Sequence, residues 1–162
     1  MPEAVLSMQI ETKFFGRLEV ADESIFRFPS GMPGFEEQQS FVFLKSAGME
    51  PLLFMQSMTT AALCFIALPI LAAEPHYQLQ LCPDDRSELQ LSDEIEPQIG
   101  RDILCAAILC PGGGATPYPT ANLLAPIVVN LQKRIGIQAI QNHSAYSHQH
   151  PILAGKEAAP CS

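Results

Sequence analysis

The sequence predicts an all-β protein, a small antiparallel β-barrel or sandwich with one or two short helices. Apolar residues mostly recur with a period of two, and about ten such runs are separated by short turns. This pattern is typical of barrels and sandwiches, because alternate residues of a strand point to opposite faces. Only 16% of the 162 residues are charged, which disfavours a long solvated helical bundle.

The first half of the chain contains six predicted strands. In the first of them Met8, Ile10 and Thr12 alternate with polar residues. In the last, an apolar run stops at Pro69, which lacks a backbone donor for a sheet. The six strands are expected at residues 8–12, 18–20, 25–28, 41–44, 52–55 and 63–68.

The second half contains four predicted strands and a short helix. Asp84 or Asp85 could cap this helix, which would run through Leu89, because acidic residues are favourable in a first helical turn. The four strands are expected at residues 77–81, 103–109, 127–129 and 135–139.

We expect a single domain over residues 1–153. Residues 154–162 lack apolar anchors, so we expect this tail to be disordered. The N-terminal residues have neither a basic region nor a long apolar stretch, and the longest apolar run, 61–73, is too short to span a bilayer. Five cysteines without a C-x-x-C pair indicate reduced thiols. The sequence therefore predicts a cytoplasmic protein that does not contact a membrane.

Residues 28–37, FPSGMPGFEE, predict a tight turn that buries aromatic rings. Pro33 presets φ for the second position of a type II turn, and Gly34 supplies the positive φ of the third. Phe28 and Phe35 flank this turn, and we expect both rings inside the protein. The role predicted for these four residues is structural.

A second proline-rich segment, residues 116–130, is predicted to contain a turn followed by two leucines. Asn122 can hydrogen-bond its own backbone in an Asx turn, and Pro126 opens the following strand as a structural residue. Leu123 is expected in the core, whereas Leu124 suits either the core or an exposed binding ridge.

The net charge of −8 constrains the partners. With nine Lys and Arg residues in the whole chain, direct nucleic-acid binding is not expected. Acidic residues are dense between residues 74 and 102, where they form either a solvated surface or a docking surface for a basic protein. A catalytic carboxylate pair is disfavoured because no apolar segment covers either acid. The residues proposed for docking are Glu74, Asp84, Asp85, Glu88, Asp93, Glu94 and Glu96.

No cofactor, metal or catalytic motif is evident. The run PGGG lacks the spacing of a phosphate-binding loop. His143, His148 and His150 are close in sequence, but no Cys, Asp or Glu lies between residues 141 and 152 to complete a metal site, so surface histidines are the favoured interpretation. We therefore expect a protein that is not an enzyme.

In order along the chain, several motifs resemble the flagellar assembly factor family of the FliW type. The most specific are GMPGFE in residues 31–36 and NLLAPIVVN in residues 122–130. The others are Phe15-Gly16, Met55-Gln56-Ser57, Phe65-Ile66 with Pro69, Tyr77, Gly136-Ile137-Gln138, and Tyr146 with His150-Pro151. The sequence departs from the family pattern at Leu68, where an acid is frequent, and at Leu124 and Gln149, where basic residues are frequent.

The resemblance implies a compact, mostly antiparallel β-barrel that performs no catalysis. It also implies two protein partners: newly made flagellin, and the basic translational regulator CsrA, which represses flagellin synthesis. Export of flagellin would free the factor to capture CsrA. On this basis the acidic residues 74–96 are predicted to face CsrA, and Asn122 and Leu124 to contact flagellin.

A small-molecule-binding barrel is the alternative. Phe43, Phe54 and Phe65 are large side chains on predicted strands, and they favour a filled interior over a ligand cavity.

Overall fold

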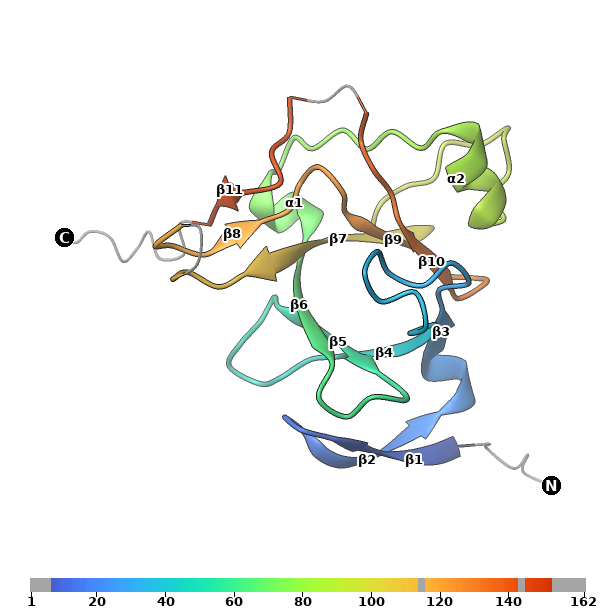
Figure 1. The fold of residues 1–162 in the computed structure, drawn as a ribbon. Helices are drawn as coiled ribbons and strands as arrows, with labels where there is room; N and C mark the ends of the chain where they lie inside the picture. Colours follow the sequence, from blue (N-terminus) through green and yellow to red (C-terminus); the bar gives the residue numbers. More distant parts are fainter. Residues whose placement is uncertain (1–6, 114–115, 143–144, 153–162) are drawn as a thin grey trace.

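The computed structural model describes residues 7–113, 116–142 and 145–152 (Figure 1). Its strands are β1 Ser7–Thr12, β2 Gly16–Ala21, β3 Ile25–Arg27, β4 Ser40–Leu44, β5 Leu53–Ser57, β6 Cys64–Pro69, β7 Ile103–Cys110, β8 Thr120–Ala121, β9 Ile127–Asn130, β10 Ile135–Gln138 and β11 His150–Pro151. Its helices are the 3₁₀ turn η1 Asp22–Ser24, α1 Ile70–Ala73 and α2 Pro83–Glu88. The tail predicted at residues 154–162 lies outside the described residues. None of the described helices is long and apolar enough to cross a membrane.

Seven strands close into a barrel. Their order is β7-β6-β5-β4-β3-β10-β9, and β9 returns to pair with β7. All neighbours are antiparallel except β3 and β10, which meet in parallel through Arg27 and Ile135. Closure leaves no unpaired sheet edge in the ring. The predicted small, mostly antiparallel barrel with short helices is therefore confirmed.

Two smaller strand pairs lie outside the ring. β1 and β2 form a separate hairpin below the barrel (Figure 1). Its apolar face, with Ile10 and Val20, packs against Val42 of β4 and Met58. At the other side, β8 pairs antiparallel with the end of β7, and β11 pairs antiparallel with β8.

The barrel interior is filled by large side chains. Phe28, Phe41, Met55, Ile127 and Val129 have no exposed surface and form one cluster. The rings of Phe28 and Phe41 pack edge to face, with centroids 5.4 Å apart. Phe43 and Phe65 pack against this cluster, as predicted. Phe54 does not: its ring packs against Phe15, 5.3 Å between centroids, because its neighbour Met55 takes the inward-facing position on β5.

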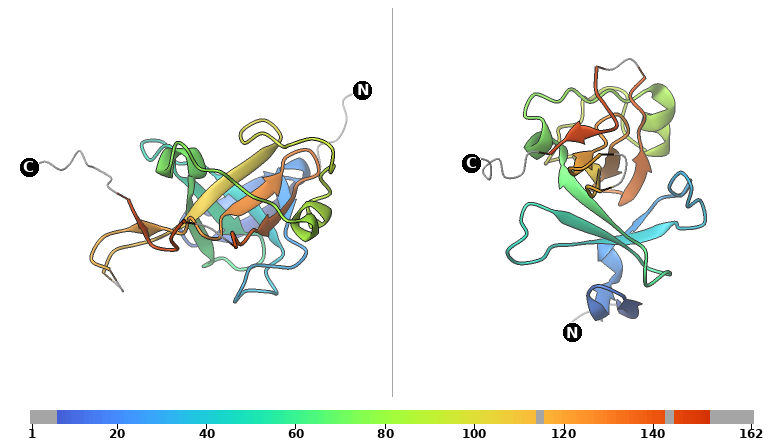
Figure 2. Two further views of the ribbon diagram at one scale, coloured as in Figure 1. Left: turned by 90° about the horizontal axis from the view of Figure 1, so that it is seen from above. Right: turned by 60° about the vertical axis from the view of Figure 1, so that its left-hand side comes forward.

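A second core lies between the barrel and the segment that joins α1 to α2. It contains Ile70, Tyr77, Leu89, Ile103 and Leu123, all buried. The Tyr77 hydroxyl donates a hydrogen bond of 2.6 Å to the Leu123 carbonyl, and burial raises the pKa of this hydroxyl above its usual value. The segment 74–82 is thereby held across one side of the barrel, with α1 and α2 at its two ends (Figures 1 and 2).

The predicted tight turn is present, but only one of its two aromatic rings is buried. Gly34 has φ +86°, and the Phe35 amide donates a bond of 2.6 Å to the Met32 carbonyl, as a type II turn requires. Phe28 is fully buried as expected. The prediction for Phe35 is wrong: its side chain is 44% exposed, and its ring lies edge-on against Phe65, 5.5 Å between centroids. The turn projects the ring outward because Phe28 and Phe41 already fill the interior beneath it.

Residues 77–81 are the one predicted strand that the structure does not pair in a sheet. Their burial alternates as predicted, with Tyr77 buried and the glutamines exposed. No strand among the described residues pairs with them. Instead, side chains of Gln141 and Tyr146 form hydrogen bonds with their backbone.

The remaining differences involve very short elements. α1, β8 and β11 have two to four residues each, too few to produce a periodic signal. The predicted helix is present as α2, but its N-cap is Cys82, and Asp84 and Asp85 occupy the first turn.

Candidate functional site

Helix α2 presents three of the acidic residues predicted for docking. Pro83 at the first helical position and the acids of the first turn explain why the helix begins there. Asp85 accepts a long bond of 3.4 Å from the Cys82 amide. Glu88 accepts a bond from the hydroxyl of Ser30. Asp84 is exposed to solvent, whereas Asp85 and Glu88 are half-buried.

The end of α2 turns the chain into the acidic loop that follows. The Leu91 amide bonds to the Arg86 carbonyl at 2.9 Å, and the Gln90 amide bonds to the Ser87 carbonyl at 3.0 Å. This is the hydrogen-bond pattern of a Schellman motif, with Gln90 at φ +58° in the place that usually holds glycine. The loop therefore leaves the helix at once and carries Asp93 and Glu94, both exposed.

Arg86 shapes this loop from inside. Its guanidinium donates to the carbonyls of Ser92 at 3.1 Å and Ile95 at 3.3 Å, and pairs with Glu96 at 2.8 Å. The Arg86 side chain is 16% exposed and that of Glu96 78% exposed. Arg86 therefore holds the acidic loop in place, and it neutralises the charge of Glu96 more than the charges of Asp93 and Glu94.

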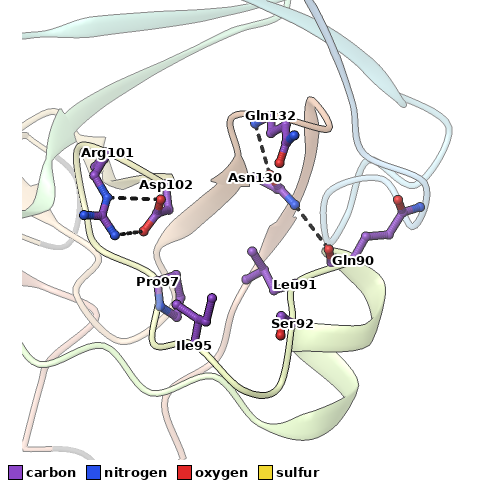
Figure 3. Close-up of a pocket in the computed structure, with 9 residues that line it drawn as sticks. All are labelled: Gln90, Leu91, Ser92, Ile95, Pro97, Arg101, Asp102, Asn130 and Gln132. Carbon is purple, nitrogen blue, oxygen red and sulfur yellow. Dashed lines mark hydrogen bonds and ion pairs between the residues drawn. The ribbon is translucent and has the colours of Figure 1, made fainter.

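A cavity of about 310 Å³ lies between the acidic loop and the turn that joins β9 to β10 (Figure 3). Asn130 forms part of its wall and donates a bond of 2.8 Å to the Leu89 carbonyl. At the opposite side Arg101 pairs with Asp102 at 3.1 Å, and this hydrogen bond lowers the pKa of the Asp102 carboxyl. A lowered pKa is the wrong direction for a general acid at neutral pH. None of the acids predicted for docking lines this cavity.

Two adjoining depressions form a groove on another face, where the Pro33-Gly34 turn meets α2 and β10. They share Pro33 and Gln138 as lining residues. We call this surface the turn groove. It joins segments that are far apart in the sequence, which is the usual character of a binding surface on a rigid scaffold.

The acidic arm of the turn groove has a volume of about 200 Å³. Asp85 and Glu88 reach it from α2, and Glu36 reaches it from the turn. Three carboxylates in one small depression create a negative potential that attracts basic side chains.

The apolar arm has a volume of about 240 Å³. Its lining includes Met32, Pro33, Phe65, Ile108, Asn122, Gln138 and His148. The exposed ring of Phe35 packs against Phe65 beside it. An apolar depression next to an acidic one suits a polypeptide with apolar and basic side chains.

The structure separates the two residues predicted to contact flagellin. Asn122 lines the apolar arm, and its side-chain oxygen accepts bonds from the amides of Leu124 at 3.1 Å and Ala125 at 3.0 Å. The predicted Asx turn is thereby confirmed. Leu124 is half-buried and does not line the groove, while Leu123 is buried and Pro126 is buried at the start of β9.

Other predicted residues lie elsewhere. Glu74 follows α1 and accepts a bond of 2.9 Å from the His76 amide, far from the acids of α2 (Figure 1). His143 lies outside the described residues. His148 lines the apolar arm, and His150 pairs in β11. Within the described ranges no group of three or more Cys, His, Asp or Glu residues is arranged to hold a metal ion.

Sequence reasoning did not assign Glu36, Phe65, Ile108 or Gln138 to a site. Each has an ordinary place in its local pattern: a turn residue facing solvent, or an alternate residue of a strand. Their grouping follows from barrel closure, which brings β6, β7 and β10 around the same turn, and local patterns carry no signal for it.

Comparison with known proteins identifies the family. The family model described as FliW protein matches residues 9–152. The flagellar assembly factor FliW of Desulfitobacterium hafniense is 38% identical over 151 residues, covering 93% of this chain and 95% of the relative. FliW of Bacillus subtilis is 35% identical over 147 residues, covering 90% and 96%.

A solved structure agrees with these relatives. The crystal structure of the flagellar assembly factor FliW superposes with a TM-score of 0.76 at 33% identity, over 89% of this chain and 96% of that one. The motifs singled out in the sequence lie within the matched range. The chain belongs to the FliW family of flagellar assembly factors.

Proposed function

We propose that this protein works in the cytoplasm by binding two polypeptides in turn, flagellin and a basic CsrA-type regulator, without a catalytic step. While flagellin is scarce, the protein holds the regulator and thereby permits flagellin synthesis. When unexported flagellin accumulates, it occupies the protein and the regulator is released to repress its message.

The observation that best supports this proposal is the turn groove. Its acidic arm, with Glu36, Asp85 and Glu88, offers carboxylates to a basic protein, and its apolar arm adjoins it. Amphipathic helices such as those at flagellin ends bind through apolar side chains. Two partners whose contacts overlap at Pro33 and Gln138 would exclude each other.

The filled barrel supports protein binding over the small-molecule alternative. A ligand-binding barrel needs an internal cavity, whereas Phe28, Phe41 and Met55 pack together, fully buried, inside this one.

Binding to the regulator is tested by reversing the charge of α2. We expect the triple variant Asp84→Lys, Asp85→Lys, Glu88→Lys to bind CsrA at least tenfold more weakly at low salt, with a shallower salt dependence. Because Asp85 bonds to the start of the helix, the neutral variant with Asn, Asn and Gln at these positions is measured as well. It keeps hydrogen-bond acceptors and should lose affinity to a smaller extent.

The matched control reverses three acids away from α2, at Glu19, Glu23 and Glu50, all exposed. It changes the net charge equally, so it should alter the association rate slightly and leave complex lifetime unchanged. Equal losses of CsrA affinity in the two charge-reversed triple variants, or no loss in either, would contradict an acidic contact at α2.

Binding to flagellin is tested with Leu124→Glu and Asn122→Ala, against Leu131→Glu as a control on the exposed β9–β10 turn. We expect the first two to weaken flagellin binding and the third to leave it unchanged. Partner switching is tested by titrating flagellin into the complex with CsrA. Release of CsrA in proportion to bound flagellin is expected, and a stable ternary complex would contradict the switch.

A further inference from the structure

The segment 77–81 has the side-chain arrangement of a β-strand without a strand partner. It contains no turn or bend, and burial alternates along it, from buried Tyr77 through exposed Gln78 and Gln80 to half-buried Leu79 and Leu81. In Figure 2 it runs as a drawn-out stretch of chain between α1 and α2.

One edge of this segment is occupied by side chains that imitate a neighbouring strand. The Gln78 amide donates a bond of 2.8 Å to the Tyr146 hydroxyl. Gln141, which is buried, accepts a bond of 2.8 Å from the Gln80 amide and donates one of 3.0 Å to the Gln80 carbonyl. These paired bonds to one residue are what an antiparallel neighbour would supply.

The other edge is open. In an extended chain, the N–H and C=O groups of successive residues point to opposite sides, so those of Leu79 and Leu81 point away from Gln141. Within the described residues these two amides and two carbonyls have no hydrogen-bond partner. An unpaired strand edge of this kind is a template for another strand.

A depression of about 410 Å³ adjoins this segment, and Tyr77, Leu79 and Leu81 are among its lining residues. Leu71, Leu79, Leu81 and Ile99 give it apolar walls, and Glu96 lies at its rim. The opposite wall cannot complete a ladder itself, since Pro97 has no N–H and the Gln98 carbonyl already accepts bonds from the amides of the turn that follows.

We propose that this edge binds an extended segment of a basic protein by strand addition. The segment forms backbone hydrogen bonds with Leu79 and Leu81. Its alternate apolar side chains fill the depression against Leu71 and Ile99, and a Lys or Arg side chain pairs with Glu96. The site shares no lining residue with the turn groove, so its failure would leave the proposed function intact.

Charge complementarity indicates a basic occupant. The chain has a net charge of −8, and Glu96 lies in the same loop as the exposed Asp93 and Glu94. Arg86 donates to two carbonyls of this loop and pairs with one carboxylate oxygen of Glu96 at 2.8 Å. The Glu96 side chain is 78% exposed, so its other oxygen remains accessible to a cation of an incoming chain. A second acidic chain, including another copy of this protein, would be repelled at this rim.

The test uses the whole protein and a synthetic octapeptide in which valine alternates with lysine. Amide exchange followed by NMR should show the Leu79 and Leu81 amides exchanging fast in the free protein and about tenfold more slowly at saturation with peptide. The amides of Gln78 and Gln80 are already bonded, so their exchange should change much less.

Peptide and protein variants distinguish strand addition from charge attraction alone. Methylation of the backbone nitrogens of alternate valines removes the donors facing the open edge, and binding should fall about tenfold. Glu96→Gln should weaken binding about threefold, while Glu94→Gln, the same change two residues away, should have a smaller effect.

Four results would overturn the proposal. They are no binding at millimolar peptide, equal affinity for the methylated peptide, equal affinity for a peptide with glutamate in place of lysine, or protection of Leu79 and Leu81 by raising the protein concentration without peptide. The last result would assign the edge to self-association.

Discussion

The two asparagines of the NLLAPIVVN motif differ in one hydrogen-bonding role, and replacing each by aspartate tests that difference. Asn122 uses only its side-chain oxygen among the described residues, as an acceptor for two backbone amides. Asn130 also accepts two amides, those of Gln132 at 3.1 Å and Lys133 at 3.2 Å, but in addition its nitrogen donates to the Leu89 carbonyl. Aspartate keeps the acceptors and removes the donor.

The expected costs differ for this reason. Asn122→Asp should change the free energy of unfolding by less than about 1 kcal/mol, because every acceptor role is retained. Asn130→Asp loses a buried bond of 2.8 Å, leaves the Leu89 carbonyl without its partner and places a carboxylate oxygen against it. A lost bond and an unsatisfied carbonyl together cost about 2–4 kcal/mol. For a domain of this size that lowers the melting temperature by roughly 4–15 °C.

The assay is urea denaturation followed by circular dichroism, repeated at neutral and acidic pH. In the folded state the carboxyl that Asn130→Asp introduces is buried beside the Leu89 carbonyl, which disfavours its charged form, and it accepts two backbone amides, which favour that form. The pH dependence of the stability deficit measures which effect is larger, because a raised folded pKa makes the deficit shrink on acidification and a lowered one makes it grow. Equal stabilities for the two variants at neutral pH would refute this account of the motif.

Three further predictions concern stability. Gly34→Ala should lower the free energy of unfolding by about 1 kcal/mol, because φ is +86° and no atom lies near the new methyl. Gly31→Ala should lower it by about 2–4 kcal/mol, because the new methyl would lie 2.5 Å from the backbone oxygen of Glu36. Gln90→Gly should stabilise by about 0.5 kcal/mol, since glycine relieves the positive φ at the end of α2. Burial raises the pKa of the Cys105 thiol from 9.0 to about 12, so the protein should lose stability between these pH values relative to Cys105→Ala. Thermal and chemical denaturation measure all three.

Each of these predictions has a control in the same chain. Gly48 has φ +85° and open space around it, so Gly48→Ala should match Gly34→Ala. If Gly31→Ala matched them too, the steric reasoning would be wrong. Arg134, also at φ +58°, offers a second site for the change to glycine. For the thiol, a stability difference from Cys105→Ala that stays constant with pH would exclude its contribution.

Much of the barrel is determined by local sequence. A period of two identifies β1, β2, β3 and β10. Short apolar or β-branched runs identify β4 to β7 and β9, and of these β5 and β9 are buried on both faces. The Pro33-Gly34 pair specifies its turn through φ alone, and the oxygen of Asn122 reaches only nearby amides. These features depend on residues within a few positions of one another, so a linear pattern is sufficient to predict them.

The tertiary structure decided everything that depends on which segments become neighbours. The pattern of Tyr77, Leu79 and Leu81 is that of a strand, yet whether it acquires a ladder depends on Gln141 and Tyr146, which are remote in the sequence. Phe35 and Phe28 look alike in sequence, but barrel closure leaves interior space for only one of them. The turn groove arises in the same way, from residues on the Pro33-Gly34 turn, α2, β6, β7 and β10, among others. Backbone preferences act over a few residues, whereas burial and hydrogen-bond partners are assigned by the whole chain once it has closed into the barrel.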